Sequence, residues 1–227
     1  MRKYFDELSI AESIKNTEAI AKIVSSLKIK KGAKLLDIGC NVGFSTELIS
    51  KGIEEPELYG CDIDESFRDE CEKRKIRFEK ACATSLPYKD RYFDVVILSQ
   101  VLEHIVDTDL ALSNVYRVLK DDGLFICSVP NIASLHNRLF LLFGKQPTVI
   151  PASRYRVDDN RSDKASPDHV RAFTPSSFKR LLIKNKFKIL EFKGSGFYPF
   201  PTSVSKFFAS AFPSLSVIII AVCTKSI

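Results

Sequence analysis

The chain has 227 residues, of which 45% are hydrophobic and 11% aromatic, so it is long and apolar enough to bury the core of one domain. This composition excludes an intrinsically disordered protein. The formal net charge is +6, and residues 131–186 hold eleven Lys and Arg against four Asp and Glu. Such a basic region can steer an acidic substrate or touch anionic lipid headgroups, and solvated basic surface is an equally good interpretation.

Six cysteines are scattered without a C-x-x-C pair. This pattern favours reduced thiols in a cytoplasmic protein over a disulfide framework or a zinc site. No basic segment followed by an apolar one opens the chain, so no signal peptide is expected. The longest nearly apolar run, 207–223, contains Pro213 and is shorter than the roughly 20 residues of a spanning helix. We interpret it as a loop and a buried strand, and expect at most peripheral contact with a membrane.

The first 31 residues predict an amphipathic helix that leads into the domain and covers a sheet edge, in preference to contacting the substrate. They begin polar and end at Gly32. The apolar side chains at near-helical spacing are Ile10, Ile14, Ala21, Val24 and Leu27.

The stretch from Lys34 to Phe44, KLLDIGCNVGF, joins a strand-like run to a glycine-punctuated turn and then to a helical pattern. Gly39 and Gly43 allow the backbone to turn sharply and to approach a ligand without a Cβ in the way. Asp37 adds a fixed acceptor at the end of the strand. A dinucleotide fingerprint would read G-x-G-x-x-G, whereas this turn reads D-x-G-x-x-x-G. A carboxylate here suits a ligand with a cationic group better than one with phosphates.

This turn resembles motif I of the class I S-adenosylmethionine-dependent methyltransferases, which usually reads D/E-x-G-x-G-x-G. Asn41 replaces the middle glycine, and Asn is among the residues that tolerate positive φ. The resemblance covers residues 32–131 and, more loosely, 168–225. It implies S-adenosyl-L-methionine as cofactor and S-adenosyl-L-homocysteine as product. It also implies an α/β fold with a doubly wound, mostly parallel seven-stranded sheet, helices on both faces and an antiparallel closing strand.

A second strand, 57–62, ends in Asp62, 25 residues after Asp37. Because the carboxyl ends of neighbouring parallel strands meet at the ligand, Asp62 is placed to accept hydrogen bonds from two ribose hydroxyls. The run G-C-D-I-D, which includes Ile63, resembles the family's second motif. Asp64 is expected to cap the helix that follows it.

After a short strand, 76–80, the segment A-C-A-T-S-L-P-Y resembles the family's D-A-x-x-L-P-F, which closes over the adenine. Cys82 stands where the usual acid would bind the adenine amino group. A thiol is a weak acceptor, so adenine recognition here is expected to depend on backbone groups and apolar contact.

The continuous apolar run 92–99 marks a central strand that is buried on both faces. With the residues after it, it reads F-D-V-V…L-E-H and resembles the family's fourth motif. His104 can act as a general base, with Glu103 either orienting it or pointing elsewhere, or both can pin the turn by hydrogen bonding. Some quinone-precursor O-methyltransferases have E-x-x-E-H here, implicated in divalent-metal binding. Because Gln100 replaces the first acid, no metal site is predicted.

The residues implied to bind the cofactor are Asp37, Gly39, Cys40, Gly43, Asp62, Ile63, Cys82, Ala83, Ser99 and Gln100.

A helix over 107–119 and a fifth strand over 124–129 follow. The pattern R-V-L-K-x-x-G…V-P-N resembles the family's next segment. Strands alternate with helices up to this point, which predicts a parallel, doubly wound sheet.

The alternation then breaks at residues 132–167, which we interpret as a substrate lid over the cofactor site in preference to a passive insertion. Tyr155 in this segment is expected to contact the substrate. A helical stretch opens it, with Leu139, Phe140 and Phe143 either covering the site or touching an apolar substrate or a membrane surface.

The tail carries H-x-R-x-F-T-P, which resembles a stretch in branches that act on sugars, lipids and quinone precursors. His169 is a candidate base and Arg171 a candidate anion clamp, and an ordinary surface turn is the alternative. Thr174 is expected to cap a helix. Strands over 187–192 and 216–224 would form the antiparallel closing pair.

We therefore expect one methyltransferase domain over residues 1–227. Its parts are a helical cover (1–31), a cofactor-binding core (32–131), a lid (132–167) and a C-terminal helix with closing strands (168–227).

The predicted activity is methyl transfer to a small molecule, at an oxygen of a sugar, lipid-linked or phenolic compound. An anionic or lipid-linked acceptor would suit the basic region. The alternative is a non-catalytic cofactor-binding or interaction protein on the same fold. No nucleic-acid partner is expected, because no N-P-P-Y-type tetrad follows the fourth strand. The sequence does not indicate an oligomeric state.

Overall fold

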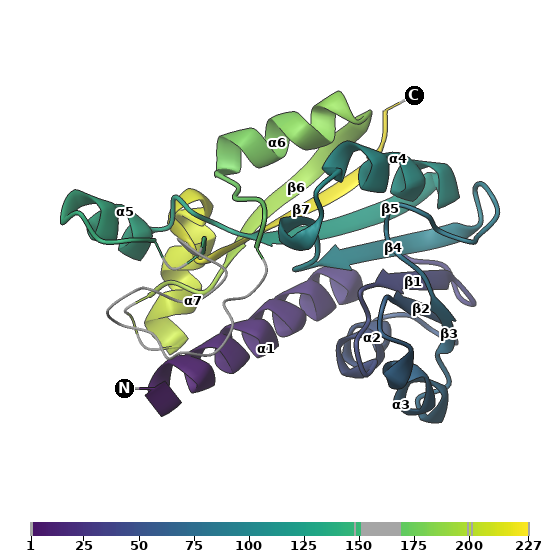
Figure 1. Ribbon diagram of the computed structural model, residues 1–227. Helices are drawn as coiled ribbons and strands as arrows, with labels where there is room; N and C mark the ends of the chain where they lie inside the picture. Colours follow the sequence, from purple (N-terminus) through teal and green to yellow (C-terminus); the bar gives the residue numbers. More distant parts are fainter. Residues whose placement is uncertain (1, 148, 151–168, 199, 201, 227) are drawn as a thin grey trace.

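The computed structural model describes residues 2–147, 149–150, 169–198, 200 and 202–226 (Figure 1). Tyr155 and half of the predicted lid, residues 148 and 151–167, lie outside the described residues. The lid and the substrate contact of Tyr155 therefore stay predictions.

Within the described residues, a seven-stranded sheet forms the centre of the molecule (Figure 1). Its strands are β1 (Lys34–Ile38), β2 (Glu57–Asp62), β3 (Arg77–Lys80), β4 (Phe93–Ser99), β5 (Leu119–Pro130), β6 (Phe187–Ser195) and β7 (Ile218–Lys225). They lie in the order β3-β2-β1-β4-β5-β7-β6. Strands β1 to β5 pair in parallel, and β7 runs antiparallel to both of its neighbours. The predicted fold class, with its antiparallel closing strand, is confirmed.

Helices cover both faces of this sheet. They are α1 (Arg2–Ser26), α2 (Phe44–Ser50), α3 (Arg68–Lys73), α4 (Thr108–Val118), α5 (Leu135–Leu142), α6 (Pro175–Lys184) and α7 (Thr202–Ala211). Short 3-10 turns are η1 (Glu65–Phe67), η2 (Leu102–His104) and η3 (Pro213–Leu215). Figure 1 shows α4 and α6 above the sheet and α1, α2 and α3 below it.

Strand β4 is buried on both faces, as its continuous apolar sequence predicts. Val96 and Leu98 belong to the core that contains buried side chains of α4 and α6. Val95 and Ile97 belong to the opposite core, which contains residues of α1. Because successive side chains of a strand point to opposite faces, one unbroken apolar run supplies both cores.

The predicted N-terminal helix is present as α1, and its buried face is set by three side chains. Ile20, Ile23 and Val24 pack against the sheet, whereas Ile14 is exposed. The spacing of three and four residues brings the buried side chains onto one stripe of the helix.

Two predicted helix caps are present. The Asp64 carboxylate accepts a hydrogen bond from the Ser66 amide at the start of η1. Thr174 and Ser177 form a reciprocal capping box at the start of α6. These side chains satisfy amides that have no partner within the first turn of their helices.

The structure corrects the loop predicted at the start of the apolar run 207–223. The first part of that run lies in α7, which ends before Pro213. Ser205 and Ala209, four residues apart, are buried on one face of α7, while Phe207 is exposed. Pro213 and the three serines of the run favour a loop in the sequence, which explains the error, and the buried strand predicted in the same run is confirmed as β7.

Strand β5 begins earlier than expected. Phe93 of β4 pairs with Leu119, and a register shift follows before Val95 pairs with Leu124. The predicted start at 124 was therefore five residues late. The polar residues between Leu119 and Leu124 lie at an irregularity of the ladder that resembles a β-bulge.

Asn131 fixes the end of β5 to the segment that enters β7. Its side chain is fully buried, and Nδ2 donates to the carbonyl oxygens of Ser214 (3.0 Å) and Ser216 (2.8 Å). Oδ1 accepts a hydrogen bond from the Ala133 amide at 2.9 Å. This side chain thus satisfies backbone groups in the segment before β7 and in the segment after β5.

We expect Asn131→Ala to destabilise the fold by about 2 kcal/mol, because it leaves buried carbonyl groups without donors. That corresponds to a fall in Tm of roughly 4–8 °C for a chain of this size. Thermal and urea unfolding would measure it. Asn185→Ala is a matched control, since Asn185 donates to exposed Asp109 and its loss should cost much less. Equal losses in the two variants would contradict the prediction.

Candidate active site

The turn between β1 and α2 has the backbone that its glycines predict. Gly39 has a φ of 76°, Gly43 a φ of 78°, and Asn41 a φ of 51°. A Cβ built on Gly39 would lie 2.5 Å from Val101 Cγ2, and one on Gly43 would lie 2.5 Å from Ile76 Cδ1. Both glycines are therefore required by conformation and by packing, and Asn41 adopts the positive φ that its residue type tolerates.

Asp37 is a buried carboxylate at the end of β1. Its Oδ2 accepts a hydrogen bond from Thr46 Oγ1 of α2 at 2.6 Å. Burial raises the pKa of Asp37 to about 7, against the opposing effect of the Thr46 hydrogen bond and with a further increase from the charge of Asp62. A cationic group bound beside Asp37 would favour its ionised form.

Asp62 ends β2 at the same edge of the sheet. Its Oδ2 accepts from the Asn41 amide at 3.0 Å, and its Oδ1 accepts from the Asp64 amide at 3.1 Å. The amides of Gly39 and Cys40 donate to the carbonyl of Cys61. The structure therefore brings together the turn after β1 and the acid after β2, at the point where the strand order reverses between β1 and β4. That reversal is where open α/β sheets bind ligands.

The remaining residues expected around the adenine also follow β2 and β3. Ile63 is 70% exposed, so its apolar side chain is available to a flat ligand at this edge. Cys82 is exposed and its Sγ accepts a hydrogen bond from Thr84 Oγ1 at 3.2 Å, while Ala83 is buried. All six cysteines are free thiols, as the scattered pattern predicts.

Ser99 and Gln100, at the end of β4, turn their side chains toward β5 and α1. Ser99 Oγ lies 3.0 Å from Ser128 Oγ and accepts from Asn16 Nδ2 at 2.9 Å. Gln100 has a φ of 57°, and its Nε2 donates to Ser128 Oγ at 3.3 Å. A buried polar network therefore joins the ends of β4 and β5 to the N-terminal helix.

Sequence reasoning missed Asn16 as part of this network. Asn16 is buried, and Nδ2 also donates to Ser128 Oγ at 3.1 Å. Its Oδ1 has no hydrogen-bond partner within the described part of the chain. The signal was available, because Asn16 lies four residues before Ile20 and seven before Ile23, on the apolar face of α1. A polar residue on such a face indicates a specific partner.

The two candidate bases lie together although 65 residues separate them. The rings of His104 and His169 have centroids 4.8 Å apart and an interplanar angle of 64°. The Glu103 carbonyl accepts hydrogen bonds from the amides of Val170 (2.8 Å) and Arg171 (3.1 Å). The Arg171 guanidinium donates to the Val106 carbonyl through Nε at 3.2 Å and also through Nη2. Arg171 thus helps to hold the segment that begins at His169 against η2.

Glu103 is almost completely buried, and its predicted role of orienting His104 stays a prediction. Its side chain is 1% exposed, and Oε2 has no hydrogen-bond partner among the residues that the structure describes. Burial raises the pKa of Glu103 to about 8. One carboxylate oxygen, Nδ1 or Nε2 of His104 and the same of His169 can be chosen within 4.8 Å of one another. Sequence reasoning paired Glu103 with His104 and did not join both to His169.

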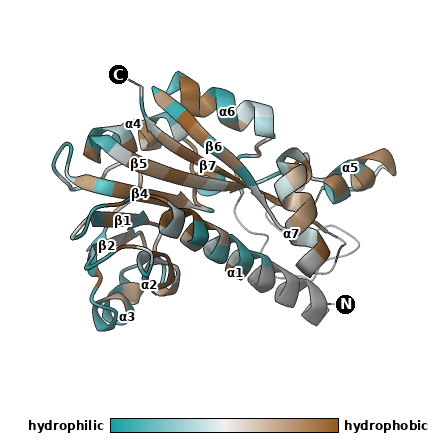
Figure 2. Ribbon diagram, turned by 180° about the vertical axis from the view of Figure 1, so that it is seen from behind, coloured by the Kyte–Doolittle hydropathy of each residue, from teal (hydrophilic) through white to brown (hydrophobic). Residues whose placement is uncertain are grey.

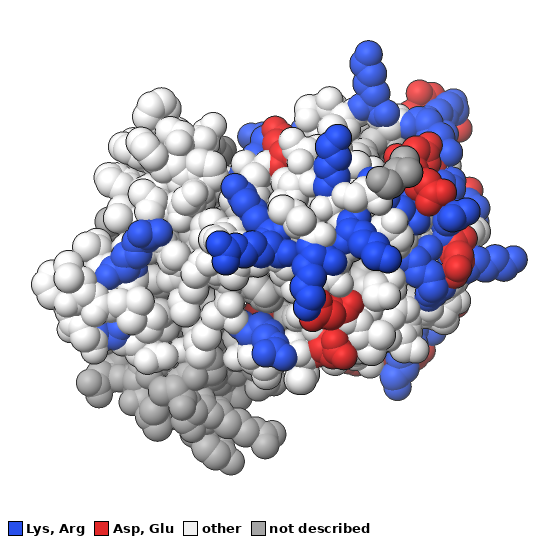
Figure 3. All heavy atoms as spheres, turned by 90° about the horizontal axis from the view of Figure 1, so that it is seen from above, with Lys and Arg blue, Asp and Glu red and all other residues white. Residues whose placement is uncertain are grey.

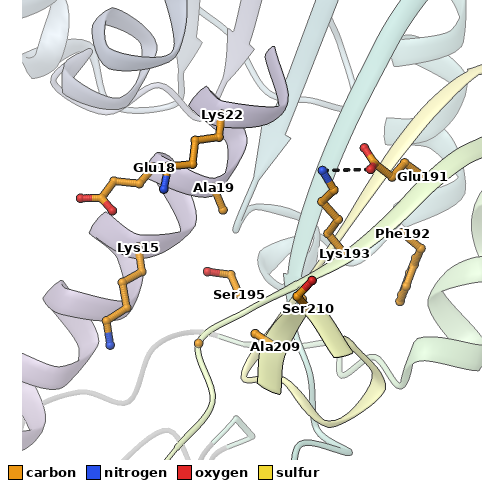
Figure 4. A pocket seen from close by; sticks show the side chains of 12 residues that line it. Lys15, Glu18, Ala19, Lys22, Glu191, Phe192, Lys193, Ser195, Ala209 and Ser210 are labelled. Carbon is orange, nitrogen blue, oxygen red and sulfur yellow. Dashed lines mark ion pairs between the residues drawn. The ribbon is translucent and has the colours of Figure 1, made fainter. Parts of the chain in front are cut away.

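A hollow of about 620 Å³ lies between α1, β6 and α7 (Figure 4). Lys15 and Lys22 of α1 and Lys193 of β6 line it, and Lys193 pairs with Glu191 at 2.9 Å. None of the ten residues expected to bind the cofactor lines this hollow. The hollow is therefore distinct from the turn after β1.

Comparison with known families decides the class of the protein. A family model described as "Methyltransferase domain" matches residues 12–191. The chain belongs to this methyltransferase family. The expected class I S-adenosylmethionine-dependent methyltransferase family is thereby confirmed, and with it S-adenosylmethionine as the cofactor.

Individual relatives agree with this assignment. A demethylmenaquinone methyltransferase of Lactobacillus johnsonii is 32% identical over 111 residues, which are 45% of this chain and 46% of the relative. One from Staphylococcus carnosus is 31% identical, over 47% of this chain and 46% of the relative. The chain thus spans about half the length of the curated relatives that it matches.

Solved structures share the fold. A Thermotoga maritima protein, described as an S-adenosylmethionine-dependent methyltransferase and possible histamine N-methyltransferase, has a TM-score of 0.63 and 17% identity. The match covers 98% of this chain and 95% of that protein. The [4+2]-cyclase SpnF has a TM-score of 0.62 and 18% identity, over 92% of this chain and 81% of the cyclase.

We expect Asp62→Ala to weaken binding of S-adenosylhomocysteine roughly 10-fold or more, because two ribose hydroxyls lose a charged acceptor. Calorimetric titration would measure the Kd. Asp64→Ala is a matched control, since the neighbouring Asp64 carboxylate caps η1 instead. An unchanged Kd in Asp62→Ala would remove this residue from the cofactor site.

The affinity for S-adenosylhomocysteine should rise with pH through about 7, the pKa that burial gives to Asp37. Below that pKa the carboxyl is protonated, so binding the ligand's ammonium group requires loss of a proton, and affinity falls by up to about 10-fold per pH unit. Titrations from acid to neutral pH, in buffers of different ionisation enthalpy, would detect the released proton. The same slope in Asp37→Asn would contradict the assignment.

Proposed function

We propose that this chain transfers the methyl group of S-adenosylmethionine to an oxygen atom of a small-molecule acceptor. The observation that carries the proposal is the pair of imidazoles, His104 and His169, 4.8 Å apart just beyond the end of β4. An oxygen acceptor must lose its proton, and an imidazole is the side chain best suited to take it near neutral pH.

For methyl transfer from a sulfonium, the protein mainly has to align the acceptor with the methyl group and remove the acceptor's proton. The acceptor oxygen attacks the methyl carbon as the carbon–sulfur bond breaks, and the sulfonium leaves as the neutral thioether of S-adenosylhomocysteine. The hydroxyl proton passes to His169 or His104. Holding the two reactants in line can lower the activation barrier by roughly 7–11 kcal/mol. Asp37, Gly39, Gly43 and Asp62 would hold the cofactor for this step.

The acceptor class is supported by two observations. The relatives named demethylmenaquinone methyltransferases favour a phenolic or quinone-related compound over a sugar. The end of α5 carries exposed apolar side chains, with Leu142 and Phe143 each 74% exposed, and this helix is largely apolar in Figure 2. An apolar or lipid-linked acceptor would suit such a surface.

Charge is unevenly distributed around this surface. Figure 3 shows Lys and Arg gathered over the face that carries α4 and α6, whereas the lobe with α5 shows only a few of them. No helix in the described ranges is both long and apolar enough to cross a membrane. We propose a cytoplasmic protein that acts on an apolar or lipid-linked acceptor and makes at most peripheral contact with a membrane. Anion clamping by Arg171 is part of the same proposal.

A second candidate is a cofactor-binding protein without methyltransferase activity. Cys82 stands where the family's adenine-binding acid is expected, which weakens one cofactor contact. The [4+2]-cyclase SpnF has the same fold, and a fold does not by itself define a reaction. Saturable binding of S-adenosylhomocysteine without methyl transfer to any acceptor class would favour this candidate.

His169→Ala should lower kcat by about 10²–10⁴-fold, the usual contribution of a general base, while leaving the Kd for S-adenosylhomocysteine unchanged. The assay uses labelled S-adenosylmethionine with phenolic, quinol, sugar and lipid-linked acceptors, and mass spectrometry and NMR locate the new methyl group. The unchanged Kd controls for folding. Full turnover in His169→Ala and His104→Ala would place the base elsewhere, and a methyl group on carbon would refute the oxygen acceptor.

A further inference from the structure

We propose that α5 and α7 form a docking surface for an anionic lipid membrane. The surface consists of the exposed apolar side chains of residues 139–143 and 200–212, and we call it the apolar tip. In the described part of the chain, nearly half of the exposed large apolar side chains belong to these two segments. A cluster of this kind marks a contact surface, whereas single exposed apolar side chains do not.

Helix α5 is polar on its buried side and apolar on its exposed side. Leu141, Leu142 and Phe143 are exposed, whereas Asn137 is fully buried. Asn137 Nδ2 donates to the carbonyl oxygen of Asn131 at 3.2 Å, so the buried amide is hydrogen-bonded. A surface helix in water normally has the opposite arrangement, with its apolar stripe toward the core.

Helix α7 has the same inverted arrangement. Its buried side carries Ser205 and Ala209, and the Ser205 hydroxyl accepts a hydrogen bond from the Phe197 amide at 2.7 Å. Phe207 is 68% exposed, and Phe212, just after the helix, is exposed as well. Large apolar side chains on the outside and small or polar ones on the inside suit an apolar exterior.

The two helices lie at the same end of the molecule (Figures 1 and 2). The rings of His136 in α5 and of Tyr198, before α7, have centroids 5.6 Å apart. Helix α5 follows β5 and α7 follows β6, and these strands run in the same direction because both are antiparallel to β7. The apolar tip therefore extends from the edge of the sheet at which β1 and β2 end in the cofactor-binding residues.

Charge favours a lipid membrane as the occupant of this surface. Residues 131–157 and 192–227 contain no Asp or Glu. Arg138 of α5 is exposed, and so is Lys145, two residues after Phe143. Basic side chains beside exposed apolar ones attract anionic headgroups while the apolar side chains enter the acyl region.

A second copy of the chain would fit the apolar tip less well. A twofold interface brings the same surface of two copies together, so Arg138 and Lys145 would meet like charges. The segments that form the tip offer no carboxylate to pair with them. The helices have 8 and 10 residues, so they would lie in the membrane interface and not cross the bilayer.

The inference deepens the proposed function and rests on it for the nature of the acceptor. Docking at the apolar tip would turn the cofactor edge of the sheet toward the bilayer. An apolar acceptor dissolved there could then reach the site without transfer through water, which is unfavourable for apolar surface.

Fluorescence quenching by lipid tests the position of the surface. The chain has no tryptophan, so one introduced Trp reports on one position. Phe143→Trp and Phe207→Trp should each be quenched by vesicles of phosphatidylcholine and phosphatidylglycerol with brominated acyl chains. Ile183→Trp is the matched control, since exposed Ile183 lies at the end of α6, close to the start of β6. Equal quenching of the control, or no quenching at either tip position, would overturn the proposal.

Co-sedimentation of the whole protein with the same vesicles measures the contribution of the apolar side chains. Replacing Leu142 and Phe143 together by Ser, or Val204 and Phe207 together by Ser, should lower the partition coefficient by at least about 10-fold. Ile183→Ser should leave it unchanged, and circular dichroism confirms that each variant is folded. Partitioning that survives both double substitutions would refute the docking surface.

The charge argument has a separate test. The wild-type protein should bind vesicles with phosphatidylglycerol roughly 10-fold more tightly than neutral vesicles, and added salt should reduce the difference. Arg138→Gln combined with Lys145→Gln should remove this preference, whereas Lys184→Gln, on α6, should keep it. Equal binding of neutral and anionic vesicles by the wild-type protein would contradict the proposal. A dimer that Phe207→Ser dissociates, in a protein that binds no vesicles, would assign the surface to a second copy instead.

Vesicle binding requires no methyl transfer, so this proposal and the proposed function can fail separately. Vesicle binding through the apolar tip would support the docking surface even if no acceptor is methylated. Methyl transfer to an oxygen of an acceptor, by a protein that binds no vesicles, would support the proposed function and refute the docking surface.

Discussion

The pairing of β1 between β2 and β4 is the constraint on which the cofactor site depends. Ile38 is in register with Cys61 on one side and with Leu98 on the other, so three strands end at one edge of the sheet. The chain must leave each strand there in a tight turn. Positive φ angles at Gly39 and Gln100 meet this demand, and the Gly39 amide donates to the Cys61 carbonyl. The positions of the cofactor-binding candidates follow from backbone pairing more than from their own side chains.

A second backbone constraint brings the two candidate bases to this edge of the sheet. Without the two amides that bind the Glu103 carbonyl, nothing in the local sequence would bring His169 to His104. Arg171 strengthens the same junction through the Val106 carbonyl. An arginine that the sequence suggests as an anion clamp therefore also has a structural task. Long-range backbone hydrogen bonds of this kind rigidify a site that local turns alone would leave loose.

The sequence predicted what local patterns determine. The strand ends at Asp37 and Asp62, the helix caps at Asp64 and Thr174, and the glycine-dependent turn all follow from spacing and residue type. It did not predict α7, because the serines and Pro213 around its C-terminal end are typical of a loop.

The burial of Asn16 and Glu103 was missed for a different reason. Their significance comes from burial against segments distant in the chain: Asn16 against the ends of β4 and β5, and Glu103 beside His169. A sequence shows that a residue is polar, but only the fold shows that it is buried without a second partner. Among the residues that the structure describes, one side-chain oxygen of each has no hydrogen-bond partner, which only the fold reveals.

Glu103 is the buried carboxyl group beside the two candidate bases. Burial raises the pKa of Glu103 to about 8, so the group is largely protonated at neutral pH and ionises more readily when a positive charge comes near it. A proton taken up by His104 or His169 during the proposed reaction would be such a charge. Glu103 would then act on the acceptor through the two histidines and not by touching it.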